Sequence, residues 1–164
     1  MNQNIIKYNS VISIKFIEKV RELITKEINN TPENAHKNLI SKKNILEHGT
    51  DQATSFHKLI YGDFDKGSSS TLLPFYYELC KLISKDLSKS YGIEEWAVQR
   101  FPSLRVQFPN NISVFESHID YDYSHPRGEI NHFLAITDCK ENATLWVEET
   151  IGWSDFKPLN LNKG

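Results

Sequence analysis

The chain has 164 residues and a net charge of −2, with 39% hydrophobic and 24% charged residues, as in an ordinary globular protein. This length suits one domain with a substantial core, and the charge gives no basis for binding nucleic acid or an anionic membrane. The start has no signal-peptide features, no run is long enough to span a bilayer, and Cys80 and Cys139 suggest free thiols, so we expect a cytoplasmic protein.

Helical periodicity dominates the first 95 residues. After a short extended start over Ile5–Ile14, apolar residues recur at helical spacing over Ile14–Ile28, with charged residues on the other face. This pattern predicts a scaffold helix that faces the core. Thr31, followed by proline and glutamate, is a helix-start signal, and it predicts a weaker helix over Asn34–His48.

The next region is less regular until a second strong helix. His57 and Tyr61 fall in a short helical patch, and Gly62–Ser70 has the composition of an exposed, flexible loop. In an enzyme such a loop can cover the mouth of an active site, although a plain surface connection is more common. Thr71–Tyr91 is the clearest helix, with one apolar stripe and with Gly92 to end it.

From Trp96 onward the pattern changes to short β-rich runs separated by turn residues. No helical period occurs between Leu104 and Glu149, where Ile130–Thr137 and Thr144–Glu148 are among the predicted strands. Such strands are typical of a jelly-roll or cupin-like sandwich. We therefore predict an α+β fold with a single domain over residues 1–164, in which residues 1–95 are helical support and residues 96–164 are β-rich and carry the site.

His118-Ile119-Asp120 lies at the centre of the β-rich part. In an extended segment residues i and i+2 point to the same face, so His118 and Asp120 can aim a nitrogen and an oxygen at one point. These are two of the three ligands of a 2-His-1-carboxylate triad, which holds non-haem Fe(II) and leaves positions open for substrate and oxygen. The alternative is a surface histidine beside a solvated aspartate, because H-x-D often occurs by chance.

Four motifs together resemble one family. They are Arg105-x-Gln107-x-Pro109, Phe115-Glu116-Ser117-His118-x-Asp120, Tyr123-Ser124-His125-Pro126-x-Gly128-Glu129-Ile130-Asn131 and Thr144-Leu145-Trp146-Val147-Glu148. They are similar to the Fe(II)/2-oxoglutarate-dependent oxygenase-like superfamily, which has a double-stranded β-helix fold, in the branch that includes a streptomycin-biosynthesis protein. The resemblance implies a hydroxylase-type oxygenase with Fe(II) and the cosubstrate 2-oxoglutarate, acting on a polar small molecule, for example in sugar or natural-product tailoring.

Polar residues on an inner sheet face need a partner or a ligand, which makes them candidates for the pocket. The predicted site comprises the metal ligands His118 and Asp120, the cosubstrate contacts Asn131 and Arg105, and the substrate contacts Glu129, Gln107, His125 and Trp146. Alternatives remain open. Glu129 and Asn131 can form a hydrogen-bonded structural pair, and Arg105 can pair with Glu94 or Glu95 at the surface instead of binding the carboxylate of a ligand. His132 must point away from Asn131, and whichever of the two faces inward would contact cosubstrate.

The sequence departs from the family pattern near its end. The resemblance implies a later histidine as the third ligand and then an arginine for 2-oxoglutarate, but no histidine follows His132 and no arginine follows Arg127. We count about five strands where the fold needs about eight. We therefore expect a truncated oxygenase that binds Fe(II) weakly and can form a homodimer through an unpaired edge. The alternatives are a non-catalytic cupin-like module that binds a small ligand or partner, and a metal-free cupin isomerase with His118 as its base.

Overall fold

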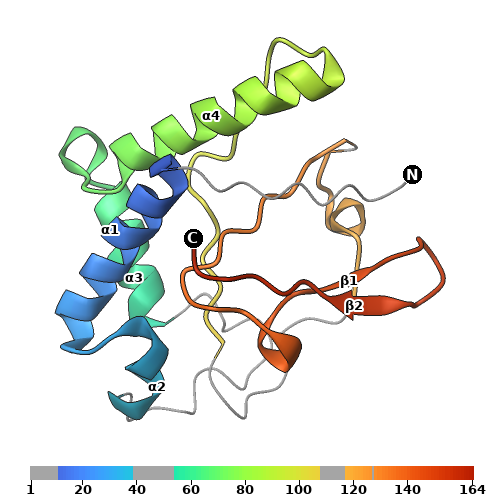
Figure 1. Cartoon of the computed structure of the whole chain (residues 1–164). Helices are drawn as coiled ribbons and strands as arrows, with labels where there is room; N and C mark the ends of the chain where they lie inside the picture. The colour runs from blue at the N-terminus through green and yellow to red at the C-terminus, as the bar shows by residue number, and fades with distance from the viewer. Residues whose placement is uncertain (1–10, 39–53, 108–116, 127) are drawn as a thin grey trace.

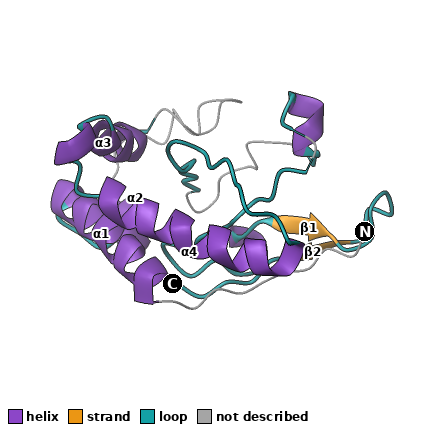
Figure 2. Cartoon of the chain, turned by 90° about the horizontal axis from the view of Figure 1, so that it is seen from above, coloured by secondary structure: helices purple, strands orange, loops and turns teal. Residues whose placement is uncertain are grey.

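The computed structural model of the chain describes residues 11–38, 54–107, 117–126 and 128–164. Within these ranges the long helices α1, α3 and α4 gather on one side, and an antiparallel hairpin, β1–β2, lies on the other (Figure 1). Figure 2 shows the same separation of α1, α2 and α3 from the hairpin. The α+β class is therefore as predicted, with most of the regular structure in the helices.

α1 (Val11–Ile28) is the helix against which the core is built. It packs against α3 and α4 with one buried apolar stripe, which explains why the segment is helical. The stripe contains Phe16, Val20 and Ile24. The helix predicted from periodicity is confirmed. The extended start predicted over Ile5–Ile14 is wrong at its end, because Ile12 already packs against the core as part of α1, while residues 1–10 lie outside the described ranges.

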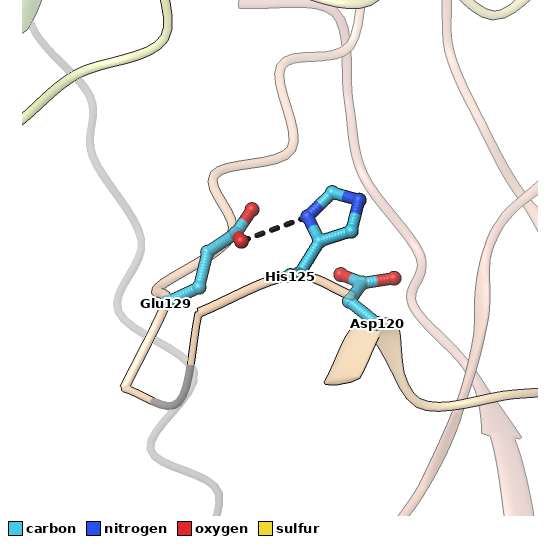
Figure 3. Close-up of side chains that lie close together, drawn as sticks. All are labelled: Asp120, His125 and Glu129. Carbon is cyan, nitrogen blue, oxygen red and sulfur yellow. Dashed lines mark hydrogen bonds and ion pairs between the residues drawn. The ribbon is translucent and has the colours of Figure 1, made fainter. Parts of the chain in front are cut away.

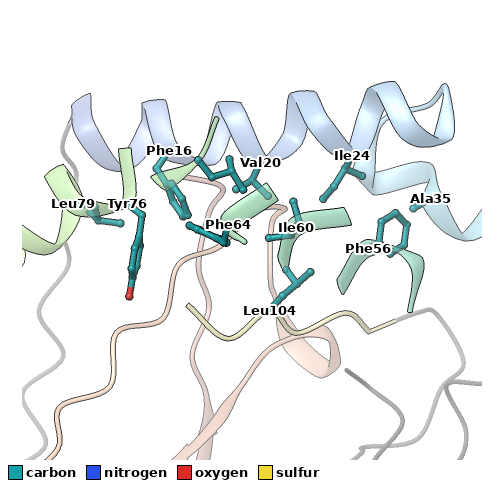
Figure 4. Close-up of a cluster of buried hydrophobic side chains, with 11 residues drawn as sticks. Phe16, Val20, Ile24, Ala35, Phe56, Ile60, Phe64, Tyr76, Leu79 and Leu104 are labelled. Atoms are coloured by element: carbon teal, nitrogen blue, oxygen red, sulfur yellow. The ribbon is translucent and has the colours of Figure 1, made fainter. Parts of the chain in front are cut away.

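α3 (Ser55–Phe64) supplies the centre of the core, and it confirms the predicted helical patch. Figure 4 shows its apolar side chains, among them Ile60 and Phe64, between α1 and the segment that contains Leu104. Phe64 is 1% exposed, and its ring centroid lies 5.0 Å from that of Phe101 in a stacked arrangement. The core is therefore continuous from the helices to the first residues of the predicted β-rich part.

The segment 62–70, predicted as an exposed flexible loop, is a compact helix junction instead. Its first three residues finish α3, and both Asp63 and Ser70 are buried. The Asp63 carboxylate accepts the Ser70 hydroxyl at 2.7 Å and the N–H of Leu72 at 2.9 Å, while Ser70 Oγ accepts the N–H of Leu73 at 2.9 Å. These bonds satisfy backbone donors that the first turn of a helix leaves without partners. A glycine- and serine-rich run thus fixes the start of the next helix.

α4 (Leu73–Tyr91) confirms the clearest helix of the sequence. It ends as predicted at Gly92, whose φ of 67° lies in the left-handed region and whose N–H bonds the Ser88 carbonyl at 2.8 Å. Across the described ranges, no helix, α4 included, combines the length and the apolarity that a bilayer crossing requires.

The predicted helix start at Thr31 is confirmed. Its carbonyl accepts the Asn34 N–H at 3.0 Å, and a 3₁₀ turn, η1 (Pro32–Asn34), leads into α2 (Ala35–Asn38). Arg21 of α1 pairs with Glu33 at 2.7 Å, and hydrogen bonding from Arg21 lowers the pKa of the Glu33 carboxyl. The rest of the helix predicted to His48 lies outside the described ranges.

β1 (Trp146–Glu148) and β2 (Phe156–Pro158) form the sheet of the described ranges. They pair antiparallel with Val147 opposite Lys157, and an isolated bridge joins Cys139 to Leu161. The strand predicted over 144–148 is thus confirmed in its second part, and its partners come from Phe156–Pro158.

The strand predicted over Ile130–Thr137 is wrong, because the structure shows neither strand nor helix there. Its apolar residues Leu134 and Ile136 pack against the helical core instead of a sheet. The Ile136 carbonyl accepts the Arg21 guanidinium at 2.7 Å, and the Ala135 carbonyl accepts the N–H of Gly164 at 3.2 Å. Partners from a helix and from the end of the chain take the place of a strand ladder. The described residues therefore do not form the predicted jelly-roll sandwich; the strands predicted near Ile112 lie outside them.

Candidate functional site

The predicted metal motif leads into a tight turn and is not part of the described sheet. η4 (Asp120–Tyr123) is a 3₁₀ turn that ends at Ser124, whose φ of 67° is left-handed. The N–H of His125 then returns to the Asp120 carbonyl at 3.3 Å, and the N–H of Glu129 bonds the Pro126 carbonyl at 3.2 Å. Two successive turns therefore bring His125 and Glu129 back beside Asp120.

Asp120 is the centre of this group. The His118 Nε2 atom lies 3.5 Å from Asp120 Oδ1, and the Asn131 amide donates a short hydrogen bond to Asp120 Oδ2. On the loop, His125 Nδ1 lies 2.8 Å from Glu129 Oε2. Asp120, His125 and Glu129 each offer a ligand atom, and these atoms lie within 4.8 Å of one another (Figure 3). The structure thus gathers five of the predicted site residues around one carboxylate.

The His118 ring is held from one side by an aromatic neighbour. Its centroid lies 4.8 Å from that of Tyr123, in an edge-on arrangement with an interplanar angle of 74°. The sequence predicted that His118 and Asp120 would point to one place through strand alternation. They do approach each other, and Ile119 between them is extended (φ −107°, ψ 139°), as that prediction requires; η4 begins only at Asp120.

The donor atoms of this group suit a divalent transition metal. Imidazole nitrogen and carboxylate oxygen at about 2.1 Å from one ion lie roughly 3 Å apart when they are neighbours in its coordination sphere. The 3.5 Å between His118 and Asp120 is close to that value. The side chains of His118, Asp120, His125 and Glu129 are 31%, 37%, 49% and 33% exposed, so among the described residues the group is open to solvent. Ligand chemistry and the His118–Asp120 spacing therefore suit a divalent transition metal, whereas these residues do not form a water-excluded pocket around it.

Asn131 and Glu129 have local partners within the group. The Asn131 amide orients the Asp120 carboxylate, which is the role of an outer-shell residue at many metal sites. Glu129 pairs with His125, and not with Asn131 as the structural alternative supposed. Partial desolvation lowers the pKa of the His132 imidazole, next to Asn131 in the sequence.

Arg105 and Gln107, predicted to bind cosubstrate and substrate, lie elsewhere. Both line a cavity of about 290 Å³ between the helices and the segment 136–138, and neither Asp120 nor His125 is part of its lining. Glu33 and His36 contribute to the same wall. The structure therefore divides the predicted site into a metal-type group and a separate cavity of mixed polar and apolar lining.

Two side chains of α3 position the cavity segment. His57 is 1% exposed; its Nε2 donates to the Leu104 carbonyl at 3.0 Å, and its Nδ1 lies 2.7 Å from Thr54 Oγ1. The Tyr61 hydroxyl accepts the N–H of the same Leu104 at 3.0 Å. The i, i+4 spacing of His57 and Tyr61 on one helix face predicts a helical patch but does not predict this contact.

Trp146, predicted to contact substrate, stands in β1 and is 46% exposed. The carboxylate of Glu148, two residues on, accepts the N–H groups of Gly152 and Ser154 at 2.8 and 2.7 Å. Glu148 therefore holds the turn of the hairpin, and Trp146 lies on this hairpin, not in the group around Asp120.

One curated protein is similar to much of this chain. Over 112 residues, or 68% of the chain, the sequence is 29% identical to the streptomycin biosynthesis protein StrG of Streptomyces griseus. The chain spans about half (51%) of the length of that relative. No family model and no solved structure matches the chain. The chain is thus similar to part of a protein that is named for streptomycin biosynthesis.

Proposed function

We propose that the chain is part of a biosynthetic enzyme, a non-haem Fe(II)- and 2-oxoglutarate-dependent oxygenase of the hydroxylase type that acts on a polar small molecule. Similarity to StrG supports the biosynthetic role. The observation that carries the metal assignment is the 3.5 Å approach of His118 Nε2 to Asp120 Oδ1, with Asn131 fixing the same carboxylate. His118 and Asp120 supply two of the three ligands of a facial iron site, and Asn131 supplies an outer-shell partner.

The residues of the chain have distinct roles in this proposal. His118 and Asp120 bind the metal, and Asn131 keeps the Asp120 carboxylate in one orientation. When bound, Fe(II) with 2-oxoglutarate and O₂ supplies the oxidation of a C–H bond; the chain contributes ligands, orientation and access.

The test is cosubstrate turnover by the whole chain. Incubation with Fe(II), 2-oxoglutarate and O₂ is expected to release succinate, and Asp120→Asn is expected to abolish this release. Asp122→Asn is the matched control, because Asp122 lies in the same 3₁₀ turn and is exposed. Equal succinate release from the parent chain and from Asp120→Asn would refute the assignment of the metal to Asp120.

A second function is favoured by a different observation, the cavity lined by Arg105 and Gln107. Its volume of about 290 Å³ lies near the lower end of small-molecule sites, and its lining combines apolar side chains with the basic Arg105 and the acidic Glu33 and Asp138. Under this alternative the chain is a non-catalytic module that binds a small ligand. Binding of 2-oxoglutarate without any metal, lost in Arg105→Gln and retained in Asp120→Asn, would favour the module over the oxygenase.

A further inference from the structure

We propose that Tyr123 is a positioning residue for the metal ligand His118, and that the turn η4 sets its ring in place. This inference rests on the proposed function and deepens it, because it assigns a residue that holds the His118 imidazole in the orientation that metal binding needs. The pattern is His118-x-Asp120-x-x-Tyr123, in which one short turn carries both the carboxylate ligand and the aromatic ring that supports the imidazole ligand.

An imidazole ligand needs external contacts that hold its orientation. Rotation about the Cβ–Cγ bond of histidine has a broad energy profile, so the backbone does not by itself decide where Nε2 points. In the structure His118 Nε2 lies 3.5 Å from Asp120 Oδ1, and the His118 side chain is 31% exposed. A rotation of this ring would carry Nε2 away from the carboxylate and would separate the two ligand atoms.

The Tyr123 ring opposes this rotation. The ring centroids of His118 and Tyr123 are 4.8 Å apart with an interplanar angle of 74°, and such an edge-on arrangement is one of the preferred geometries of an aromatic pair. Turning the imidazole changes this angle and gives up the favourable contact. Tyr123 is itself 60% exposed, so its ring covers His118 and does not fill the core.

The geometry of η4 explains why Asp120 and Tyr123 reach the same imidazole. A 3₁₀ helix has three residues per turn, so side chains at i and i+3 lie on the same side of it. Asp120 and Tyr123 are the first and the last residue of η4 and have this spacing. The His118 Nε2 atom faces the carboxylate, and the His118 ring contacts the tyrosine ring. η4 thus presents a carboxylate and an aromatic ring to one histidine.

Backbone hydrogen bonds fix η4 on both sides of Tyr123. The Asp122 N–H bonds the Ile119 carbonyl at 3.0 Å, and the Ser124 N–H bonds the Tyr121 carbonyl at 3.1 Å. Ser124 has a φ of 67°, in the left-handed region, and it ends the turn directly after Tyr123. The place of the tyrosine ring is therefore set by the main chain before any metal binds.

The test is Co(II) binding by the whole chain, measured by calorimetry, together with NMR relaxation of the His118 ring in the metal-free chain. We expect Tyr123→Ala to weaken Co(II) binding roughly 3–10-fold, because the imidazole must then be ordered when the metal binds. The same variant should lower the order parameter of the His118 ring. Tyr123→Phe keeps an aromatic ring and should restore both quantities to their values in the parent chain.

Tyr121→Ala is the matched control. It removes a tyrosine from the same turn, also about half exposed, but position 121 lies about 120° around the 3₁₀ helix from position 120. The contact between the His118 and Tyr123 rings therefore stays in place, and the variant should bind Co(II) as the parent chain does. Equal weakening by Tyr121→Ala and Tyr123→Ala would assign the effect to the turn and not to the ring, and would overturn the inference.

The remaining outcomes separate this inference from the function on which it rests. Parent-like Co(II) binding by Tyr123→Ala, with binding lost in Asp120→Asn, would overturn the inference and leave the proposed metal site standing. An unchanged order parameter of the His118 ring in Tyr123→Ala would overturn it as well. Parent-like binding by Asp120→Asn, or no binding by the parent chain, would overturn both the inference and the proposed function.

The variants are suitable because Tyr123 is exposed. Far-UV circular dichroism and thermal melting of Tyr123→Ala are expected to match those of the parent chain, since substitutions on the surface usually change stability little. Tyr123→Leu, which keeps apolar bulk without a flat ring, is a second variant for the case that Tyr123→Ala unfolds. It should also weaken Co(II) binding and loosen the His118 ring, and parent-like behaviour of this variant would overturn the inference.

Discussion

Polar side chains are buried in the helical region but exposed in the loop around Asp120. In the helical region His57, Asp63 and Ser70 are at most 7% exposed, and each contacts hydrogen-bond partners named above. Around Asp120 the polar side chains are one third to one half exposed and contact one another within a few residues of sequence. The difference teaches that the first set maintains the fold, whereas the second set is available to a ligand. The contrast makes distinct predictions for the two regions.

The largest expected effect on stability comes from replacing a phenylalanine by alanine in the helical region, compared with the same replacement in the hairpin. Phe64→Ala should lower the free energy of unfolding by about 3–5 kcal/mol, because it leaves a cavity between α1, α3 and α4. Phe156→Ala in β2 is the matched variant; its side chain is 38% exposed, and it should lose less than about 1 kcal/mol. Urea unfolding measures both. Equal losses would show that the hairpin belongs to the same cooperative core as the helices, and the comparison between regions would fail.

The next effect depends on pH. Burial alone would raise the pKa of Asp63, but hydrogen bonds from Ser70, from the Leu72 and Thr71 N–H groups and from Lys66 outweigh it and lower that pKa. In the unfolded chain the Asp63 carboxyl takes up its proton near pH 4, which is above its pKa in the folded state. The stabilisation by the ionised carboxylate is therefore present above about pH 4 and is lost as the pH falls through the lowered pKa of the folded state.

Asp63→Asn should accordingly lower the free energy of unfolding by about 1.5–3 kcal/mol at pH 7. The deficit relative to the parent chain should shrink below pH 4, because the parent then loses the same charge. Asp122→Asn, in the exposed turn η4, provides the control and should follow the parent at every pH. A deficit that stays constant from pH 7 to pH 3 would mean that the ionised carboxylate is not what stabilises the start of α4.

The smallest effect concerns self-association through the hairpin. Trp146 and Trp153 are 46% and 77% exposed, and exposed apolar residues beside a short sheet favour pairing of two chains. We expect a weak, reversible homodimer in analytical ultracentrifugation, with Kd raised roughly tenfold by Trp153→Ser, or about 1.4 kcal/mol. Tyr77→Ser removes a similarly exposed aromatic ring from α4 and should leave Kd unchanged. A monomer at all concentrations would refute the expectation.

The helices were predictable because their signals are local. The apolar spacing from Ile14 to Ile28 and the glycine at position 92 determine structure within a few residues, and both predictions hold. The run Ile130–Thr137 was not predictable in the same way. β-propensity describes a side chain that fits a half-buried surface, and here the surface is the helical core and not a sheet.

For the site, the sequence indicated the right residue types but only part of their arrangement. The i, i+2 spacing of His118 and Asp120 was enough to predict their approach. The pairing of His125 with Glu129 and of Asn131 with Asp120 depends on the positive φ at Ser124, which no residue pattern near it signals. The contact of His57 with Leu104 joins residues 47 positions apart, and a single sequence does not encode such a distance in any local pattern.

The contact of α3 with Leu104 has a consequence for hydrogen exchange. Leu104 lies in no helix or strand, yet its N–H and C=O are both bonded, to the Tyr61 hydroxyl and to His57 Nε2, and its side chain is 7% exposed. An amide in an irregular segment normally exchanges with solvent by local opening of small free energy. Here opening must break two bonds to one helix and expose core surface. The Leu104 amide should therefore exchange as slowly as the amides of α3 itself, through the unfolding of the whole helical region.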